Sequence, residues 1–587
     1  MKALIHWLQD RTGIPGLFAQ VFHAPLPGGP RWHYTWASLI LGAFLTQAIT
    51  GFFLWTHYSA STVTAWESMH HLQNEVAGGW LLRGLHHFGA QAFVVLLGIY
   101  ILQLVLRRAV RAPGEVAFWT LLLLVPLAVG LSVTGWMLPY DQHGFWAARV
   151  PLNILSITPV VGEPTRVALL GGQDVSHLTL TRFLSLHAGL LPAITFAVLL
   201  LHWLLSWRRT SSDGGAGSIQ GSYWPDQAWR DAVVLAAFVG LLVTWTAWRG
   251  GAPLGAPADP SQEYAAARPE WFFLWLFQLL KYFRGGTEVW GAVVLPTALF
   301  AILALTPWIA STRAGRLFNG LFVGALTITI VTLTALAFRE DARDPVYAQA
   351  REQAHRDAER ARQLASSPSG IPAAGGLAMV HSDPIMQGPK LFARHCASCH
   401  RFDDHDGLGR EIKGEPSAPD LHQFASRSWL TGLLDPEQIS GPHYFGGTKF
   451  ANTKMAKFVK RDVADFDETL QANLKKAIIA LSAEAQLPSQ ADSDATDAAL
   501  IAEGRELLND YDLRCTECHR FREYGEDPSA PDLTGYGSRP WMIEFVRDPA
   551  HPRFYGDRND RMPRFGAEEV LTDAEIGLIV DWLRLVQ

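Results

Sequence analysis

Two motifs of the type C-x-x-C-H lie in the last third of the chain, and together they use all four cysteines of the sequence. The spacing lets two thiols form thioethers with haem vinyl groups while the histidine binds the iron, which predicts c-type haem attachment. A redox dithiol or half of a zinc site is the alternative, but no other cysteine is left to complete a metal cage. The predicted thioether residues are Cys396, Cys399, Cys515 and Cys518, and the predicted iron ligands are His400 and His519.

Each motif opens a similar stretch of sequence, which indicates an internal repeat. The same Ser-Ala-Pro-Asp-Leu segment occupies 417–421 and 529–533, and a methionine follows further on, Met455 in the first repeat and Met562 in the second. Because a thioether opposite the histidine is typical of cytochromes c, we predict these methionines as the second iron ligands. His443 is the competing ligand in the first repeat, and a methionine that only fills the core is the alternative in both.

Histidines within apolar segments form a second candidate set, since an intramembrane histidine is costly unless it is used. His86 and His187 lie near the same end of antiparallel spans, so they can hold one haem between two helices. Arg83 and Arg182 are about a turn away and suit pairing with haem propionates. His202 lies roughly 22 Å beyond His187 at 1.5 Å per residue, which indicates a second haem level. For any one histidine, the alternative is a helix–helix hydrogen bond.

Seven apolar stretches are long enough to span a bilayer, which takes roughly 17–25 residues per helix. They lie near 34–55, 83–106, 116–138, 183–207, 231–248, 289–309 and 321–338. Residues 1–338 carry a net charge of +5 and residues 339–587 a net charge of −11, so a membrane part precedes an acidic soluble part. Haem c is normally attached outside the cytoplasm, so seven spans predict a cytoplasmic N-terminus, and the arginines between spans agree with the positive-inside rule.

The sequence therefore predicts an all-α protein in which a seven-helix membrane bundle precedes two small helical haem domains. The start lacks the pattern of a cleavable signal peptide. The predicted parts are an interfacial cytoplasmic segment at 1–33, a four-helix domain at 34–210, a three-helix domain at 211–338, a charged helix and linker at 339–385, and haem domains at 386–482 and 497–587.

Residues 31–338 resemble cytochrome b of the cytochrome bc and bf complexes. The matching segments include 79–83, 134–142 and 180–187, and the first four spans are most similar to the chloroplast-type protein. The last three spans resemble the subunit that is a separate chain in chloroplasts. The two C-terminal repeats are similar to the dihaem cytochrome c subunits of some bacterial bc-type complexes, here fused to the b subunit.

The segment Pro269-Glu270-Trp271-Phe272 resembles the family's Pro-Glu-Trp-Tyr motif at the quinol-oxidising pocket. The resemblance implies Glu270 as the acceptor of a quinol proton, because a carboxylate in apolar surroundings can have a raised pKa. It also implies that Tyr264, Phe272 and residues 144–146 line the pocket. The alternative for Glu270 is a solvated interfacial carboxylate.

The chain departs from the family at two positions. Tyr100 stands where the family has the second histidine of the second span, and it should face His202 because fourteen residues keep the same helix face. The inner haem is then five-coordinate on His202, ligated by His202 and Tyr100, or absent; we favour a retained haem with altered ligation. Thr35 stands where chloroplast-type proteins attach an extra haem through cysteine, so that haem should be missing.

The resemblance implies a quinol–cytochrome c reductase subunit in the respiratory chain of a bacterial inner membrane, with its haem c domains periplasmic. It also implies haem b, with the ligation at the second level left open, and two covalent haems c. The resemblance further implies that membrane quinol is oxidised near the outer face and that protons are translocated. Electrons would pass through a separate Rieske iron–sulfur subunit and the haems c to a soluble cytochrome, an oxidase or a reaction centre. A homodimeric complex is implied and nucleic-acid binding is not. The alternatives are a membrane-anchored electron relay without a full quinone cycle, and reverse flow that reduces quinone.

Overall fold

The computed structural model describes residues 29–212, 221–446, 448–526, 528–559 and 561–585, with a few positions before residue 29, and it describes no side chains over 207–212. The predicted interfacial segment at 1–33 therefore lies largely outside the described residues. The chain forms two compact units, residues 1–379 and 380–587. The described parts contain helices and isolated bridges but no β-strand, which confirms the all-α prediction.

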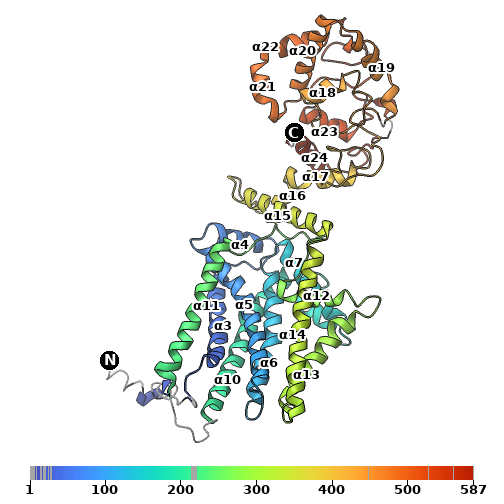
Figure 1. Ribbon diagram of the computed structural model, residues 1–587. Coiled ribbons are helices and arrows are strands. Elements are labelled where there is room, and N and C mark those ends of the chain that lie inside the picture. The colour runs from blue at the N-terminus through green and yellow to red at the C-terminus, as the bar shows by residue number, and fades with distance from the viewer. Residues whose placement is uncertain are drawn as a thin grey trace. The chain divides into compact units, whose positions relative to one another are not determined.

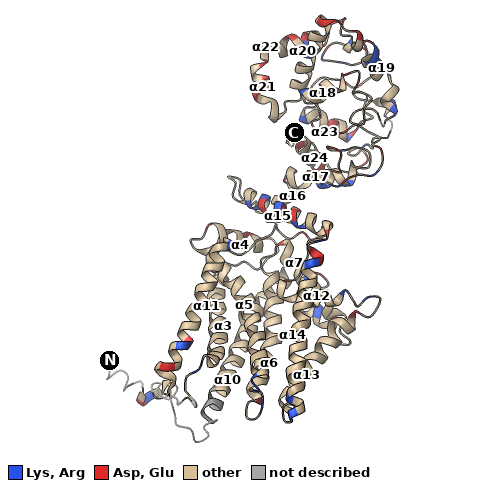
Figure 2. Ribbon diagram, in the orientation of Figure 1, with Lys and Arg blue, Asp and Glu red and all other residues tan. Residues whose placement is uncertain are grey.

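Among the described residues, seven helices are long and apolar enough to cross a membrane, and they correspond to the seven predicted spans. They are α3 (Thr35–Trp55), α5 (Gly79–Leu106), α6 (Glu115–Met137), α9 (His177–Leu184) continued by η2 (Ser185–Leu190) and α10 (Leu191–Ser212), η3 (Tyr223–Gln227) with α11 (Ala228–Arg249), η5 (Trp290–Val294) with α13 (Leu295–Ile309), and α14 (Arg313–Asp341). The helices run side by side in the first unit (Figure 1), and charged residues gather near their ends rather than along them (Figure 2).

Short helices and a loop cover one end of the bundle, called here the α4 end. They are α4 (Ala65–Asn74), α7 (Gln142–Ser156), α8 (Gly162–Leu170), η4 (Trp271–Phe273) and α12 (Leu274–Leu280). The loop after α11 is fixed by Asp141, which caps α7 by accepting from Gly144 N at 2.7 Å and also accepts from Gly255 N at 2.7 Å. Trp66 Nε1 donates to Gly255 O at 2.8 Å, so α4, α7 and this loop form one layer.

The segment that carries Glu270 is held to the end of α14. Arg268 forms a 2.9 Å ion pair with Asp341, and Gln278 Nε2 donates to Glu340 Oε1 at 2.8 Å. Beyond α14, the helix α15 (Pro345–Ala365) begins at a capping carboxylate, Asp344, and is followed by α16 (Gly376–His381). The predicted charged segment at 339–385 is therefore mostly helical.

The second unit contains eight further α-helices within its described residues. They are α17 (Pro384–His395), α18 (Arg427–Leu433), α19 (Lys454–Arg461), α20 (Glu468–Glu484), α21 (Ala491–Thr496), α22 (Ala498–Leu507), α23 (Arg539–Arg547) and α24 (Asp573–Leu585). Equivalent serines, Ser426 and Ser538, cap α18 and α23. One hydrophobic core includes residues from both repeats.

The helices of this unit pair across the repeats. The helix before the first motif, α17, packs on α24 at the end of the second repeat, while α22 packs on α20 at the end of the first. The α17 contact is close at Gly388, where a Cβ atom would come within 2.2 Å of Trp582 Cβ. Trp582 also lies beside Phe402, with ring centroids 4.4 Å apart. The two predicted segments, 386–482 and 497–587, thus belong to one compact unit.

Candidate functional site

The half-buried imidazoles of His86 on α5 and His187 on η2 face each other inside the bundle. Their ring centroids are 6.0 Å apart, and the ring planes are inclined by 72°. Two metal–imidazole bonds of about 2.0–2.1 Å each, with the half-width of each ring added, span about this distance. The pair therefore fits a metal held between the two histidines, as a haem iron is held.

The Nδ1 atoms of both histidines are engaged by neighbouring helices, which leaves Nε2 for a metal. His86 Nδ1 lies 3.0 Å from Thr50 Oγ1, and His187 Nδ1 lies 3.0 Å from Leu131 O. A carbonyl only accepts, so His187 Nδ1 carries the proton, the arrangement expected of a metal-binding histidine. The π-helical turn that presents His187 is a form often found at functional sites.

Two glycines give these imidazoles their room. A Cβ atom at Gly51 on α3 would lie 3.0 Å from His86 Cε1, and one at Gly135 on α6 would lie 2.6 Å from His187 Cε1. Distances this short require a neighbour to move, so glycine permits the observed ring positions.

The two arginines predicted to pair with haem propionates bind backbone carbonyls. Buried Arg83 donates to Ala252 O at 3.0 Å and to Pro253 O at 2.8 Å, and it also bonds Gln73. Exposed Arg182 donates to Ala168 O. Both side chains thus help fix the α4 end, and their pairing with propionates stays a prediction.

At the second predicted haem level, His202 and Tyr100 are in direct contact. Tyr100 Oη lies 3.2 Å from His202 Nε2, and His202 Nδ1 donates to Ala117 O at 2.8 Å. The facing of Tyr100 and His202 agrees with the helical spacing.

Glu270 is half-buried at the α4 end and belongs to a polar network with α5. Gln91 Nε2 donates to Glu270 Oε2 at 3.3 Å and to His87 Nε2 at 3.0 Å. The Trp271 indole N–H donates to Gln91 Oε1 at 3.0 Å. Gln91 thereby joins Glu270 and Trp271 to the helix that carries His86.

The electrostatic surroundings suit a carboxyl group that exchanges protons. Burial raises the pKa of Glu270, the carboxylate of Asp141 raises it further, and His143 acts in the opposite direction. Burial likewise raises the pKa of Tyr264 above its usual value. Both groups therefore stay protonated to a higher pH than an exposed glutamate or tyrosine would.

Aromatic rings surround the same region. Phe272 and Phe273 lie against Trp136, with ring centroids 6.4 and 5.6 Å away. Phe145 is buried in the layer at the α4 end, and Trp146 bonds Gln142. Our sequence interpretation missed Gln91, Asp141 and His143 as neighbours of Glu270, although a glutamine within an apolar span is a signal that could have drawn attention to Gln91.

Comparison with known proteins follows the same division of the chain. The family described as "Cytochrome b/b6/petB" matches residues 23–210, and "Cytochrome b(C-terminal)/b6/petD" matches residues 257–349. Cytochrome b6 of Cyanidium caldarium is 34% identical over 205 residues, which are 35% of this chain and 95% of that protein. This chain belongs to the cytochrome b/b6 family. Membership implies haem b and identifies the chain as a multi-pass membrane protein of electron transport.

Two further similarities cover about half of this chain. Cytochrome b of Rhodobacter capsulatus is 28% identical over 341 residues, which are 52% of this chain and 77% of that protein. A chain of a solved structure titled "Hyperthermophilic respiratory Complex III" covers 57% of this chain and 99% of its own length, with 18% identity and a TM-score of 0.47.

Beyond the cytochrome b part, the two C-x-x-C-H motifs have matching geometry. His400 Nδ1 donates to Pro419 O at 2.7 Å, and His519 Nδ1 donates to Pro531 O at 2.7 Å. Burial lowers the pKa of both histidines and raises the pKa of the Cys396 thiol. Each motif thus presents a neutral, oriented imidazole whose Nε2 can bind iron, which fits a haem of the c type.

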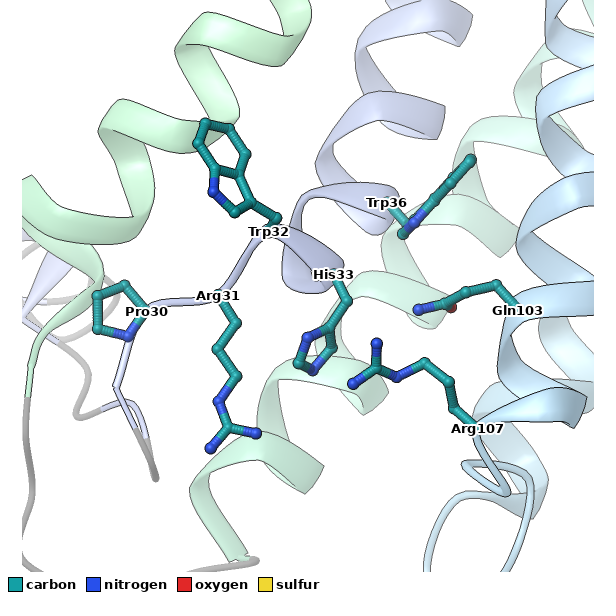
Figure 3. A pocket seen from close by; sticks show the side chains of 7 residues that line it. All are labelled: Pro30, Arg31, Trp32, His33, Trp36, Gln103 and Arg107. Carbon is teal, nitrogen blue, oxygen red and sulfur yellow. The ribbon is translucent and has the colours of Figure 1, made fainter.

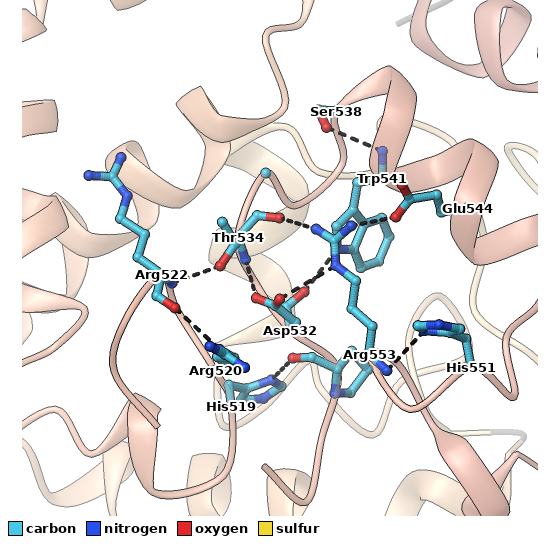
Figure 4. Close-up of polar contacts among 12 residues, drawn as sticks. His519, Arg520, Arg522, Asp532, Thr534, Ser538, Trp541, Glu544, His551 and Arg553 are labelled. Carbon is cyan, nitrogen blue, oxygen red and sulfur yellow. Dashed lines mark hydrogen bonds and ion pairs between the residues drawn. The ribbon is translucent and has the colours of Figure 1, made fainter. Parts of the chain in front are cut away.

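The loop beneath each motif is also repeated. Asp420 N donates to His443 O at 3.0 Å, and Asp532 N donates to Arg553 O at 2.9 Å. Arg553 pairs with the Asp532 carboxylate at 3.4 Å (Figure 4), and His443 lies 3.9 Å from the Asp420 carboxylate. His443 therefore takes the place of Arg553 in the repeat, which favours a structural role for it.

The methionines predicted as ligands lie at half-buried positions. Met455 on α19 packs against the small core that contains Ile439 and Val459. Met562 packs against the main core of this unit, and its carbonyl accepts from Asn559 Nδ2 at 2.9 Å. Their ligation of iron stays a prediction.

A pocket of about 610 Å³ lies where α3 begins and α5 ends. It is lined by Pro30, Arg31, Trp32, His33, Trp36, Gln103 and Arg107. Figure 3 shows the guanidinium of Arg107 beside the ring of His33. Two arginines make this lining cationic, at the end of the cytochrome b bundle opposite the α4 end.

Proposed function

We propose that this chain is the cytochrome b and dihaem c subunit of a bc-type complex, a quinol–cytochrome c reductase that oxidises membrane quinol at the α4 end and contributes to proton translocation. The observation that carries the proposal is the position of Glu270. Its half-buried carboxylate is joined through Gln91 to the helix that also presents His86. This contact supports the proposal because it connects the proposed proton acceptor to the helix that carries one proposed haem ligand.

Different residues of this chain have different roles in quinol oxidation. Glu270 accepts a proton from the quinol hydroxyl, and its raised pKa makes it a stronger base than an ordinary carboxylate. Phe272, Trp136 and Tyr264 provide apolar and aromatic walls for the quinol ring. His86 and His187 hold haem b, while His400 and His519, with their paired cysteines, hold the two haems c. Met455 and Met562 complete the latter sites.

When bound, the haems would serve as one-electron carriers that act together with a separate Rieske iron–sulfur protein between quinol and an outer-face acceptor. That acceptor is a soluble cytochrome, an oxidase or a reaction centre. The Rieske protein must be a separate subunit because all four cysteines belong to the haem c motifs. The α4 end and the C-terminal unit face the periplasm of a bacterial inner membrane, and the complex is a homodimer.

The test is quinol oxidation by the purified complex. Glu270→Gln should lower the rate of electron transfer from quinol to an added basic cytochrome by roughly 100- to 10,000-fold, the order of effect of a general base. Glu263→Gln, which changes a nearby exposed carboxylate, is the matched control and should retain the rate. Equal rates in the wild type and in Glu270→Gln would refute the proposed site.

A second candidate function is an electron relay that works without a full quinone cycle. The direct contact between Tyr100 and His202 favours it, because a full cycle relies on a second b haem at this level. Quinol oxidation that depends on Glu270 separates the reductase from the relay. Redox titration separates a full cycle, with two b-type transitions, from quinol oxidation without one, with a single transition.

A further inference from the structure

The two levels have similar ring separations but differ in what lies between the rings. The ring centroids are 6.0 Å apart for His86 and His187 and 5.7 Å apart for Tyr100 and His202, where the phenol oxygen of Tyr100 extends into the gap. Between Tyr100 and His202 the phenol oxygen and Nε2 are only 3.2 Å apart, a hydrogen-bond distance. An iron atom between an oxygen and an imidazole nitrogen would hold them about 4 Å apart, from bonds of about 2.0–2.2 Å.

Both ring nitrogens of His202 are already used by the protein. Nδ1 donates to Ala117 O at 2.8 Å, so Nε2 is the acceptor that receives the Tyr100 hydroxyl proton. The two side chains are buried, with exposed fractions of 2% for His202 and 5% for Tyr100. A buried pair whose polar atoms are hydrogen-bonded in this way forms a stable contact between α5 and α10.

Side chains fill the space around this pair. Trp36 stacks on Tyr100 with ring centroids 6.0 Å apart and planes inclined by only 10°, and Figure 3 shows Trp36 at the wall of the neighbouring pocket. Phe118, Leu121 and Leu124 are almost completely buried in the same core cluster as Tyr100. Cores of this kind are close-packed, so a porphyrin ring at this level would have to displace these side chains.

The residues that give room at the first level are not repeated at the second. Gly51 and Gly135 lie against the imidazoles of His86 and His187. Fourteen residues earlier, on the same helix faces, α3 has Ala37 and α6 has Leu121. Both replacements add side-chain atoms where the first level has none.

We propose that this chain holds a single haem b, between His86 and His187, and that the Tyr100–His202 hydrogen bond replaces the second haem as the contact between α5 and α10. The inference rests on the proposed haem-binding role of His86 and His187. It differs from our sequence interpretation, which favoured a retained inner haem. Electron transfer across the membrane through two stacked b haems is then not built into this chain.

The experiment counts haem b in the purified complex by pyridine haemochrome spectra, with the polypeptide quantified by amino-acid analysis. One haem b per polypeptide is expected, together with a single one-electron transition in a potentiometric titration. Two haems b per polypeptide would overturn the inference alone. A count of zero would overturn it together with the proposed role of His86 and His187.

Three variants test the second level directly. His202→Ala and Tyr100→Phe should keep one haem b per polypeptide, and Tyr100→Phe keeps the ring in place should His202→Ala fail to fold. A loss of haem b in Tyr100→Phe would show phenolate ligation and refute the proposal. Tyr100→His should also keep the count at one, because Leu121 and Ala37 remain; a rise to two would show that the site has room.

Discussion

Gln91 Nε2 donates to Glu270 Oε2 at 3.3 Å, across more than 170 positions of sequence. The same amide accepts from the Trp271 indole through its oxygen, at 3.0 Å. One side chain on a membrane helix therefore sets the position of two neighbouring residues in the proposed quinol site.

Gln91→Leu should misplace Glu270 and lower kcat/KM for quinol by roughly 10- to 100-fold. The reason is that a hydrogen bond to a charged group contributes about 1.5–3 kcal/mol. Gln103→Leu makes the same change near the other end of α5 and should retain kcat/KM. Steady-state quinol oxidation by the complex checks this, and haem b content should stay equal in all three proteins. Unchanged kinetics in Gln91→Leu would show that Gln91 positions nothing.

Quinol oxidation should rise with pH through the raised pKa of Glu270. The raised pKa keeps the carboxyl group protonated to a higher pH than usual, and only the carboxylate can accept a proton. As pH increases, the fraction of carboxylate increases and the rate increases with it. Pre-steady-state reduction of haem at several pH values checks this. In Glu270→Gln the rising limb should vanish; a limb that persists would assign it to another group.

His86→Ala should remove the non-covalent haem signal, because one of the two facing imidazoles is lost. His87→Ala is the matched control, since the neighbouring His87 bonds Gln91 and does not face His187. Dithionite-reduced spectra of both variants check this, with haem c absorbance as the internal standard. A full b-type signal in His86→Ala would refute the assignment of the pair.

Met562→Leu should lower the midpoint potential of one haem c, since a thioether ligand raises it. We expect a fall of at least about 59 mV, which is a tenfold change in a one-electron equilibrium. Met455→Leu should act in the same way on the other haem. His443→Gln is the control, because His443 lies beside Asp420 in the manner of Arg553. A large shift in His443→Gln would make it the ligand instead.

Trp582→Ala should destabilise the first repeat although it changes the helix that ends the second. Trp582 is buried against Phe392 and Phe402, and loss of a core tryptophan costs about 3–5 kcal/mol. The midpoint of thermal unfolding of the second unit should fall by roughly 6–20 °C. Arg584→Ala, beside it on α24, loses hydrogen bonds but leaves the aromatic core intact and should cost less. Loss of the second haem signal alone would contradict the packing of α24 on α17.

The composition and spacing of residues were enough for much of the architecture. Apolar length alone located seven spans, because a bilayer demands a continuous stretch of apolar residues from each crossing helix. The position of His86 and His187 near the same end of antiparallel spans predicted that they meet, and a spacing of fourteen residues from His86 predicted that Tyr100 faces His202. The structure brings both pairs together. The motifs likewise identified the candidate residues around Cys396, Cys515 and Glu270.

Tertiary packing decided what local patterns do not encode. No periodicity places Gln91 beside Glu270, or α24 on α17, because such contacts depend on how distant helices dock. The distance between Tyr100 and His202 depends in the same way on Trp36, Leu121 and their neighbours filling the space around them. The sequence alone determined which residues could bind haem, while the close packing of side chains decided how far apart each facing pair stands.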